Sequence, residues 1–201
     1  RMLGVPYDAH EFFQDRAEIM MSTTSTVDEA VKAGKELIDD YLGDLIDEKA
    51  RHPGDDILSR LVHNHMLKGH LNRGELLAMS RLLLAAGHET TANVTAMSVL
   101  TLLRHPEQLA ELKQQPELIP GAIEELLRYL DPTQGGRRRV ALEDVEIAGQ
   151  LIRAGEAVVA LNHVANRDEL EFDDTDRFDI HRKVDHHVAF GDGIHQCLGQ
   201  D

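Results

Sequence analysis

Residues 190–199 read Phe-Gly-Asp-Gly-Ile-His-Gln-Cys-Leu-Gly and contain the only cysteine of the chain, Cys197. Glycines lie six and four residues before this cysteine and two residues after it, so few side chains keep a bound group away from the backbone. Backbone N–H groups of such a loop can converge on a thiolate, and a thiolate is a soft ligand that suits iron. The segment therefore predicts an iron-binding loop with Cys197 as the ligand.

The alternative is that Cys197 is a small buried apolar side chain, which is the usual state of a lone cysteine. However, the pattern Phe190-Gly-x-Gly-x-His195-x-Cys197-x-Gly199 resembles the haem-binding loop of the cytochrome P-450 family. The resemblance implies that Cys197 is the proximal ligand of the haem iron. It implies that Phe190 packs beside this ligand and that His195 approaches a haem propionate. Haem contacts are also implied for the three glycines of the pattern, Gly191, Gly193 and Gly199.

The composition suits one medium domain with a core of aliphatic side chains. Of the 201 residues, 42% are hydrophobic and 4% are aromatic, and tryptophan is absent. The formal charge of −15 disfavours nucleic-acid and anionic-membrane partners. A single cysteine cannot form an internal disulfide, and the sequence has neither a membrane-spanning run nor a secretory signal. We therefore expect a soluble, cytoplasmic protein.

The two ends of the sequence indicate an internal piece of a longer protein. The first residue is Arg1 rather than methionine, and the chain stops four residues after Cys197. A haem is held between two protein faces, and chain ends are poorly ordered unless they are tied down. We expect the isolated chain to bind haem weakly and not to turn over substrate.

Three capping boxes predict helix starts in the first half of the chain. The pairs are Asp8 with Glu11, Thr26 with Glu29 and Asn72 with Glu75. Apolar residues at three- and four-residue steps predict helices over 8–21, 26–49 and 72–104, with a shorter one over 56–64. The helix over 72–104 would be about 45 Å long. Residues 82–86 within it are apolar all round, which predicts burial on every side.

The second half of the chain changes from helical to β-like patterns. Pro106 and Pro120 suit the first turns of two further helices, and the second of these should end near residue 130. Pro132 and Gly135 then break the helical pattern. Residues 137–162 combine β-branched residues with glycine turns and predict two or three short antiparallel strands, whereas residues 166–187 are charged and predict a loop. The predicted fold class is mainly α with a small β-sheet.

A polar motif, Ala-Gly-His-Glu-Thr-Thr at residues 86–91, interrupts the apolar middle of the long predicted helix. A buried glutamate is costly unless it has a partner or a function, and a threonine hydroxyl can bond the carbonyl one turn back. Small residues beside a hydroxyl and a carboxylate offer space for a diatomic ligand and a source of protons. The alternative is a polar kink, or a surface glutamate on an amphipathic helix.

This motif also resembles the cytochrome P-450 family, whose central helix crosses the distal face of the haem. The resemblance implies that Glu89 and Thr90 form an acid–alcohol pair that supplies protons for oxygen activation. It implies that Ala86 and Gly87 leave room for dioxygen. A His-Glu-x-x-His zinc motif is excluded, because Ala92 occupies the place of the second histidine.

Two further features match the family by position. Glu125 and Arg128 are three residues apart, a spacing that alone indicates only a common solvated pair. The resemblance implies instead that this pair is buried and joins a downstream arginine, Arg177, in a structural network. It also implies that Arg139 binds a haem propionate together with His195.

Together, these features predict an incomplete cytochrome P-450 fold that lacks its N-terminal half and its C-terminal end. We expect residues 1–201 to form part of one haem-thiolate monooxygenase domain, with a central helix over 72–104, a small β region over 137–162 and the haem-ligand loop over 190–199. The resemblance implies a bacterial enzyme with haem b (iron protoporphyrin IX), dioxygen as co-substrate and a small organic substrate. A separate ferredoxin or flavoprotein would donate the electrons.

Two other functions stay open from the sequence alone. One is a haem-binding or helical interaction module without turnover, which is an inactive form of the same fold. The other is a zinc site built from His187, His195 and Cys197, although no fourth ligand is spaced to complete it.

Overall fold

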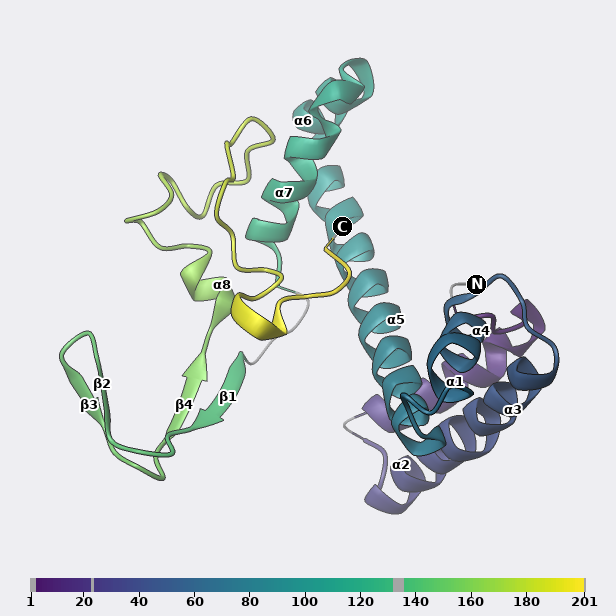
Figure 1. The fold of residues 1–201 in the computed structure, drawn as a ribbon. Coiled ribbons are helices and arrows are strands. Elements are labelled where there is room, and N and C mark those ends of the chain that lie inside the picture. Colours follow the sequence, from purple (N-terminus) through teal and green to yellow (C-terminus); the bar gives the residue numbers. More distant parts are fainter. Residues whose placement is uncertain (1–2, 23, 132–135, 201) are drawn as a thin grey trace. The chain divides into compact units, whose positions relative to one another are not determined.

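The computed structural model describes residues 3–22, 24–131 and 136–200, which form helices, short strands and long loops (Figure 1). The chain divides into two compact units, Arg1–Glu89 and Thr90–Asp201. The predicted class, mainly α with a small amount of β structure, is confirmed.

The first unit is helical. Its α-helices are α1 (His10–Met21), α2 (Val27–Gly34), α3 (Gly43–Arg51) and α4 (Ile57–Leu61), and the long helix α5 (Arg73–Arg104) begins in it. A π-helical stretch, Lys35–Leu42, joins α2 to α3, and a second one, Val62–Met66, follows α4. The helices predicted over 26–49 and 56–64 are therefore present, each with a π-helical segment that the apolar spacing did not indicate.

Two of the three predicted capping boxes form. The Thr26 N–H donates to Glu29 at 2.8 Å, and the Glu29 N–H donates back to the Thr26 hydroxyl at 3.3 Å. The Thr26 N–H and then the Thr26 hydroxyl hold the pKa of Glu29 below its ordinary value. At the start of α5, the Asn72 N–H donates to Glu75 at 2.7 Å, and the Glu75 N–H donates to Asn72 Oδ1 at 2.9 Å.

The capping box predicted at Asp8 and Glu11 is wrong. A 3₁₀ turn, Tyr7–Ala9, precedes α1, so Asp8 lies inside this turn and Ala9 takes the N-cap position. No side chain caps this helix end. Asp8 and Glu11 have the spacing of a capping box, but the helix begins two residues after Asp8 because of this turn.

The core of the first unit forms where α3 and α4 meet the first turns of α5. Its buried side chains are Leu42, Leu45, Ile46, Leu58, Val62 and Leu76. This cluster covers only one face of α5, so the prediction that residues 82–86 are buried on every side is wrong. Leu82 is 62% exposed, and Ala85 and Ala86 are exposed as well.

The second unit contains the end of α5, three shorter helices and two pairs of strands. The helices are α6 (Pro106–Gln114), α7 (Ile119–Tyr129) and α8 (Asn162–Ala165). Pro106 and Pro120 lie in the first turns of α6 and α7, as predicted. The break expected at Pro132 and Gly135 lies outside the described residues.

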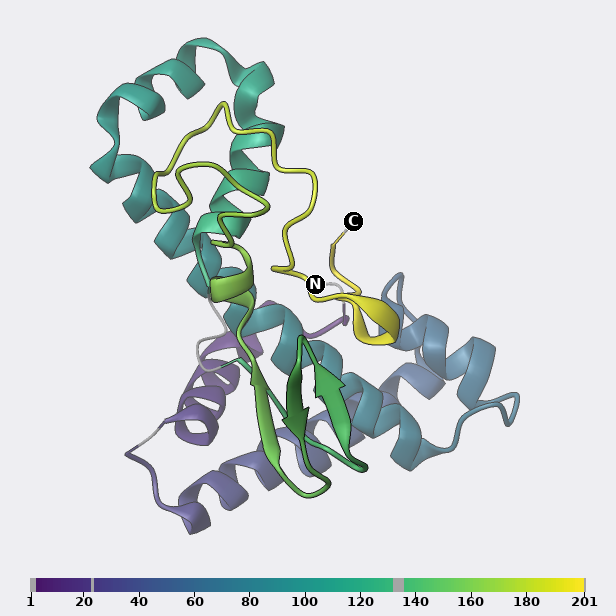
Figure 2. The same cartoon turned by 90° about the vertical axis from the view of Figure 1, so that its left-hand side faces the viewer.

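Among the described residues, the β structure consists of two separate two-stranded sheets instead of one small sheet. Figure 1 shows the two pairs apart, and in the turned view of Figure 2 they overlap. The strand β1 (Arg137–Val140) pairs antiparallel with β4 (Ala157–Ala160), and β2 (Val145–Ile147) pairs antiparallel with β3 (Gln150–Ile152). Ala148 and Gly149 both have positive φ, as the tight turn between β2 and β3 requires.

The core of the second unit lies between α6, α7 and the loop that follows α8. Leu112, Ala122 and Leu126 on the helices pack against Phe178 and Ile180 of this loop. The predicted loop over 166–187 is confirmed, and it supplies core residues although its sequence has no periodicity. Among the described helices, none has the length and apolar character needed to cross a membrane.

The capping box of α5 gives the first prediction. Asn72→Ala should lower the free energy of unfolding by about 1 kcal/mol, because the Glu75 N–H loses its side-chain acceptor. Asp8→Ala should change it by less than about 0.5 kcal/mol, because the equivalent box does not form there. Urea unfolding followed by circular dichroism measures both, and equal losses would contradict the assignment of the two helix starts.

Candidate functional site

The loop around Cys197 is held by its own backbone hydrogen bonds. The Cys197 N–H donates to the carbonyl of Phe190 at 2.9 Å, and the Gln196 N–H donates to the carbonyl of Gly193 at 3.0 Å. The Gly199 N–H donates to the Cys197 sulfur at 3.4 Å. The sulfur therefore accepts a hydrogen bond from a backbone amide within its own loop.

The loop presents this sulfur at an open surface. Gly191 and Gly193 have φ values of +75° and +81°. Apart from their chain neighbours, no atom of the described residues lies within 4 Å of where their Cβ atoms would be. Cys197 is exposed, and the neighbouring Ile194 and Leu198 are 96% and 88% exposed. An exposed thiol between apolar side chains fits a flat, apolar group that is bound through a metal, so these residues fit the haem that the sequence analysis expected.

The polar motif of the long helix lies on unbroken α-helix. Ala86, Gly87 and Glu89 belong to the first unit, and Thr90 begins the second. Ala86 and Gly87 are exposed, whereas Glu89 and Thr90 are half-buried. Among the described residues, and leaving aside the chain neighbours and the backbone of the helix, no atom lies within 4 Å of where a Cβ of Gly87 would be. Gly87 and Thr90 are three residues apart on α5 and therefore lie on the same side of the helix.

Back-bonding of a threonine hydroxyl to the helix occurs one turn beyond the motif. The Thr95 hydroxyl donates to the carbonyl of Thr91 at 2.7 Å. This is the interaction that the sequence analysis considered for the threonines of the motif itself.

A fully buried ion pair lies on α7. Arg128 donates to Glu125 through two nitrogens, Nε at 2.6 Å and Nη2 at 2.9 Å, and both side chains are 0% exposed. Arg128 Nη1 also donates to the carbonyls of Asn166 and Thr175, each at 2.9 Å. The pair is therefore a buried network, unlike the solvated pair that its spacing alone would indicate.

The arginine that joins this pair is Arg182, and the expectation of Arg177 is corrected. Arg182 Nε donates to Glu125 Oε1 at 3.1 Å. The Arg177 side chain is 66% exposed and lies 3.9 Å from Asp174 and 3.8 Å from Asp179. A turn closed by the hydrogen bond from the Arg177 N–H to the carbonyl of Asp174 directs the Arg177 side chain outward, so this residue offers its carbonyl to the network.

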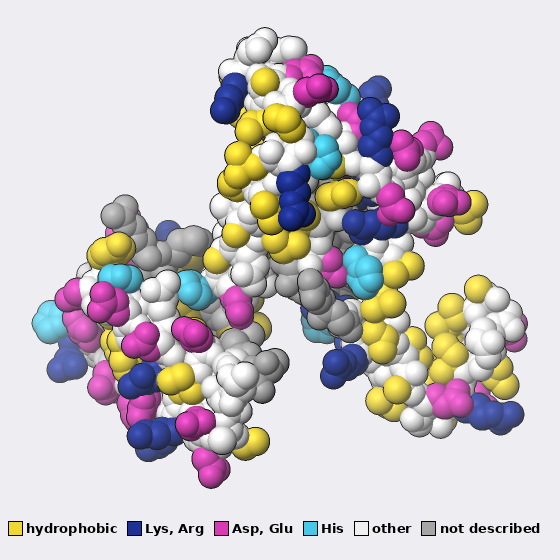
Figure 3. Space-filling model, turned by 180° about the vertical axis from the view of Figure 1, so that it is seen from behind, with side chains coloured by type: hydrophobic (Ala, Val, Ile, Leu, Met, Phe, Trp, Pro, Cys, Tyr) yellow, Lys and Arg dark blue, Asp and Glu magenta, His cyan; other side chains and the backbone are white. Residues whose placement is uncertain are grey.

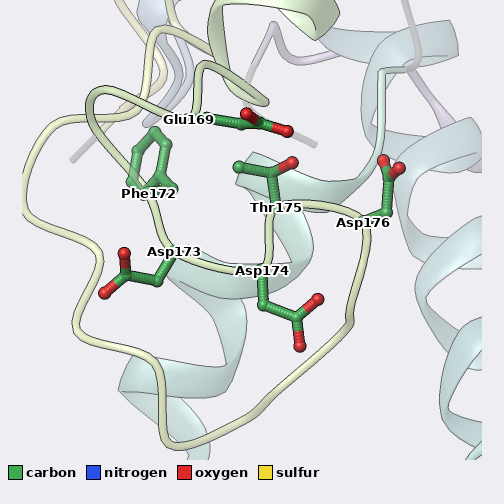
Figure 4. Close-up of a pocket in the computed structure, with 6 residues that line it drawn as sticks. All are labelled: Glu169, Phe172, Asp173, Asp174, Thr175 and Asp176. Atoms are coloured by element: carbon green, nitrogen blue, oxygen red, sulfur yellow. The ribbon is translucent and has the colours of Figure 1, made fainter.

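Arg182 also shapes an acidic hollow in the preceding loop. The hollow has a volume of about 340 Å³, and Figure 4 shows its lining residues, Glu169, Phe172, Asp173, Asp174, Thr175 and Asp176. The guanidinium of Arg182 donates to the carbonyls of Asp173 and Asp174. Arg182 therefore connects the loop that forms this hollow to the buried ion pair.

The two residues expected at the haem propionates are both exposed in the second unit. Arg139 lies on β1 opposite Val158, and its Nη1 donates to the carbonyl of Arg138 at 2.9 Å. His195 lies in the 3₁₀ turn Gly193–His195 of the cysteine loop. Exposure leaves both side chains accessible to an anionic group.

The zinc alternative has no support in the part of the chain that the structure describes. No group of three or more histidine, cysteine, aspartate or glutamate side chains is placed there to hold a metal ion. His187 is instead engaged with Glu124, at 2.8 Å from Nε2 to the carboxylate.

Apolar side chains line a groove on the second unit, formed by α6, α7 and the end of α5. Figure 3 shows hydrophobic side chains gathered over this helical part of the unit. The groove has a volume of about 420 Å³, and its apolar lining includes Leu102, Leu109, Leu112, Pro116, Ile119 and Ile123.

Comparisons with known proteins identify the relatives of this chain. The family model described as Cytochrome P450 matches residues 5–201. The chain is 48% identical over 200 residues to Cytochrome P450 105A3 of Streptomyces carbophilus, and 48% identical over 200 residues to the mycinamicin VIII C21 methyl hydroxylase of Micromonospora griseorubida. Both matches include 100% of this chain. They include 48% of the Streptomyces protein and 50% of the Micromonospora protein.

Solved structures also match this chain over part of their length. The putative thioether synthase SgvP, involved in the tailoring of griseoviridin, matches with a TM-score of 0.93 at 40% identity. The Micromonospora hydroxylase bound to mycinamicin VIII matches with a TM-score of 0.88 at 47% identity. The matches cover 99% of this chain and 51% and 50% of the two structures, so the chain spans about half the length of the relatives it matches.

The corrected network gives the second prediction. Arg182→Ala should lower the free energy of unfolding by about 2 kcal/mol, because the buried Glu125 carboxylate loses a charged donor. Arg177→Ala should change it by less than about 0.5 kcal/mol, because exposed pairs at such distances contribute little. Urea unfolding of the two variants measures the difference. A larger loss for Arg177→Ala would restore the original assignment.

Proposed function

The chain belongs to the cytochrome P450 family, and from that premise we propose that the protein carrying it is a bacterial haem-thiolate monooxygenase. Such an enzyme inserts one atom of dioxygen into a small organic substrate. The observation that carries the proposal is the exposed Cys197 sulfur, which accepts the Gly199 N–H in an open glycine loop. The assignment of residues 1–201 to a single haem-thiolate domain is part of the same proposal.

The cofactor in this proposal is haem b, held by residues of the second unit. Cys197 would hold the iron through its sulfur, and the Gly199 amide would adjust the electron density that this sulfur donates. Gly191 and Gly193 let the backbone approach the ring closely, and Phe190 accepts the Cys197 N–H through its carbonyl. When bound, a thiolate-ligated haem iron supplies the activation of dioxygen.

Arg139 and His195 provide positive charge for the propionates in this proposal. Both side chains are exposed, and the protein as a whole is strongly acidic, with a formal charge of −15. An anionic group at this surface therefore needs local cations, and charge-assisted hydrogen bonds from these two side chains would supply them.

Residues of α5 supply space and protons. Ala86 and Gly87 keep one face of the helix free of large side chains, which leaves room for dioxygen and substrate. Thr90 holds a proton at its hydroxyl, and the adjacent carboxylate of Glu89 replenishes it from solvent, because both side chains are half-buried. Leu82 is an exposed apolar residue one turn earlier and suits contact with an apolar ligand.

The remaining parts of the proposal concern partners and location. The electron donor is a separate ferredoxin or flavoprotein, and the substrate is a small organic molecule. The single cysteine fits a cytoplasmic setting, where thiols stay reduced. Substrate-dependent consumption of reducing equivalents separates this proposal from a haem-binding module without turnover.

The third prediction tests the ligand. The ferrous–CO form of the haem-loaded, full-length protein should show the strongly red-shifted Soret band of thiolate ligation. Cys197→His should abolish this band while haem can still bind, because imidazole replaces the only thiol of the chain. Cys197→Ser, which keeps the size of the side chain, should also lose the band. Survival of the band in either variant would mean that another thiol ligates the iron.

The fourth prediction tests proton supply. Thr90→Ala should retain substrate binding but divert reducing equivalents into hydrogen peroxide, with coupling to product reduced about tenfold or more. Thr95→Ala is the matched control, because its hydroxyl is exposed and bonded within the helix. Product and peroxide are measured per electron consumed. Unchanged coupling in Thr90→Ala would remove this residue from the mechanism.

A further inference from the structure

The cysteine loop has little packing of its own to hold it in place. From residue 192 to residue 200 the side chains are exposed, and two of the glycines have positive φ. Such a loop depends on hydrogen bonds at the point where the chain enters it. The entry segment is residues 186–190, and its contacts decide where the sulfur lies.

Two asparagines hold one residue of this entry segment on both sides. Asn162 and Asn166 lie one helical turn apart at α8, so their side chains share a face. The Val188 N–H donates to Asn166 Oδ1 at 2.7 Å. Asn162 Nδ2 donates to the carbonyl of Val188 at 2.9 Å. The two side chains therefore act on Val188 in opposite roles, one as acceptor and one as donor.

Further hydrogen bonds lead from Val188 to the cysteine. The Gly191 N–H donates to the same Val188 carbonyl at 2.9 Å, which sets the turn into the loop. The carbonyl of Phe190, inside this turn, accepts the Cys197 N–H at 2.9 Å. A displacement of Val188 is thus passed on to the backbone of Cys197.

In the other direction, Asn166 is held by the core of the unit. Asn166 is 2% exposed, and its carbonyl accepts Arg128 Nη1 from the buried ion pair. Next to Val188, the Ala189 N–H donates to His187 Nδ1 at 3.2 Å, so Nε2 carries the ring proton that is donated to Glu124 on α7. Two adjacent glutamates of α7 therefore have separate partners. Glu124 holds the entry segment through His187, and Glu125 belongs to the buried network.

We propose that Asn162 and Asn166 are positioning residues that clamp Val188 and thereby fix the backbone that carries the Cys197 sulfur. The consequence for haem ligation rests on the function proposed above, whereas the clamp itself does not. Because Val188 needs a donor at position 162 and an acceptor at position 166, the same isosteric change should have opposite outcomes at the two positions.

The test compares Asn162→Asp with Asn166→Asp in the full-length protein that carries this chain, first without haem. Asn162→Asp places an acceptor against the Val188 carbonyl, whereas Asn166→Asp keeps an acceptor for the Val188 N–H. Asn166→Asp also buries a carboxylate at a position that is 2% exposed, which lowers the stability of the whole unit, so hydrogen exchange over residues 186–200 is divided by exchange over residues 119–130 in α7. This ratio should rise about tenfold in Asn162→Asp and less than about twofold in Asn166→Asp.

Two outcomes would overturn the clamp. One is unchanged exchange over residues 186–200 in Asn162→Asp. The other is an equal rise of this ratio in both variants, which would indicate a general effect of the added carboxylate without a specific role of Asn162 in positioning Val188.

The haem-loaded protein gives a second, spectroscopic readout. In the ferrous–CO form, Asn162→Asp should lose part of the red-shifted band to a form without thiolate ligation, and Asn166→Asp should keep it. Equal bands in the two variants would overturn the link from the clamp to the ligand. If the unsubstituted protein lacks the band, the proposed function fails, while the exchange experiment still judges the clamp.

Discussion

The second unit depends on the burial of two opposite charges, Glu125 and Arg128, at zero exposure. Taking a carboxylate and a guanidinium out of water costs several kcal/mol for each ion, and their mutual attraction offsets this only when the remaining hydrogen-bonding groups are satisfied. Here Arg182, the Asp179 N–H and three loop carbonyls complete the network. The loop after α8 takes its path because its backbone supplies these partners.

The same burial distinguishes the residues of the proposed haem site from the residues that support them. The cysteine loop and the Ala86–Gly87 face of α5 are open, whereas Asn166 and the pair on α7 are buried. An open surface can accept a large flat cofactor without moving core side chains. The position of the sulfur at such a surface must then be set by buried neighbours. In the proposed clamp, hydrogen bonds from α7 and α8 set this position without contacting the sulfur.

Local signals in the sequence predicted most of the elements, because caps and apolar spacing act over a few residues. The helix starts predicted at Thr26, at Asn72 and at the two prolines are present. The capping box predicted at Asp8 is absent, because a 3₁₀ turn displaces the start of the helix. The cysteine motif could be found because its chemistry needs several residue types at fixed offsets. Arg182, Asn162 and Asn166 were missed, since each acts through a partner at least 22 residues away, and no local pattern marks such a contact. The prediction that residues 82–86 are buried was wrong for the same reason. The apolar character of a segment does not specify which other residues cover it.

The separation of these contacts along the chain also sets the order in which the second unit can assemble. Arg128 and Glu125 bond to groups that lie between 38 and 57 residues further on. Closing loops of this length costs chain entropy before any contact repays it, so non-local pairing slows folding. Until residues 166–182 return to α7, the two charges keep their water, and the core around Phe178 cannot close over them. We therefore expect this loop to dock only after α7 has formed, because both charges that it covers lie on that helix.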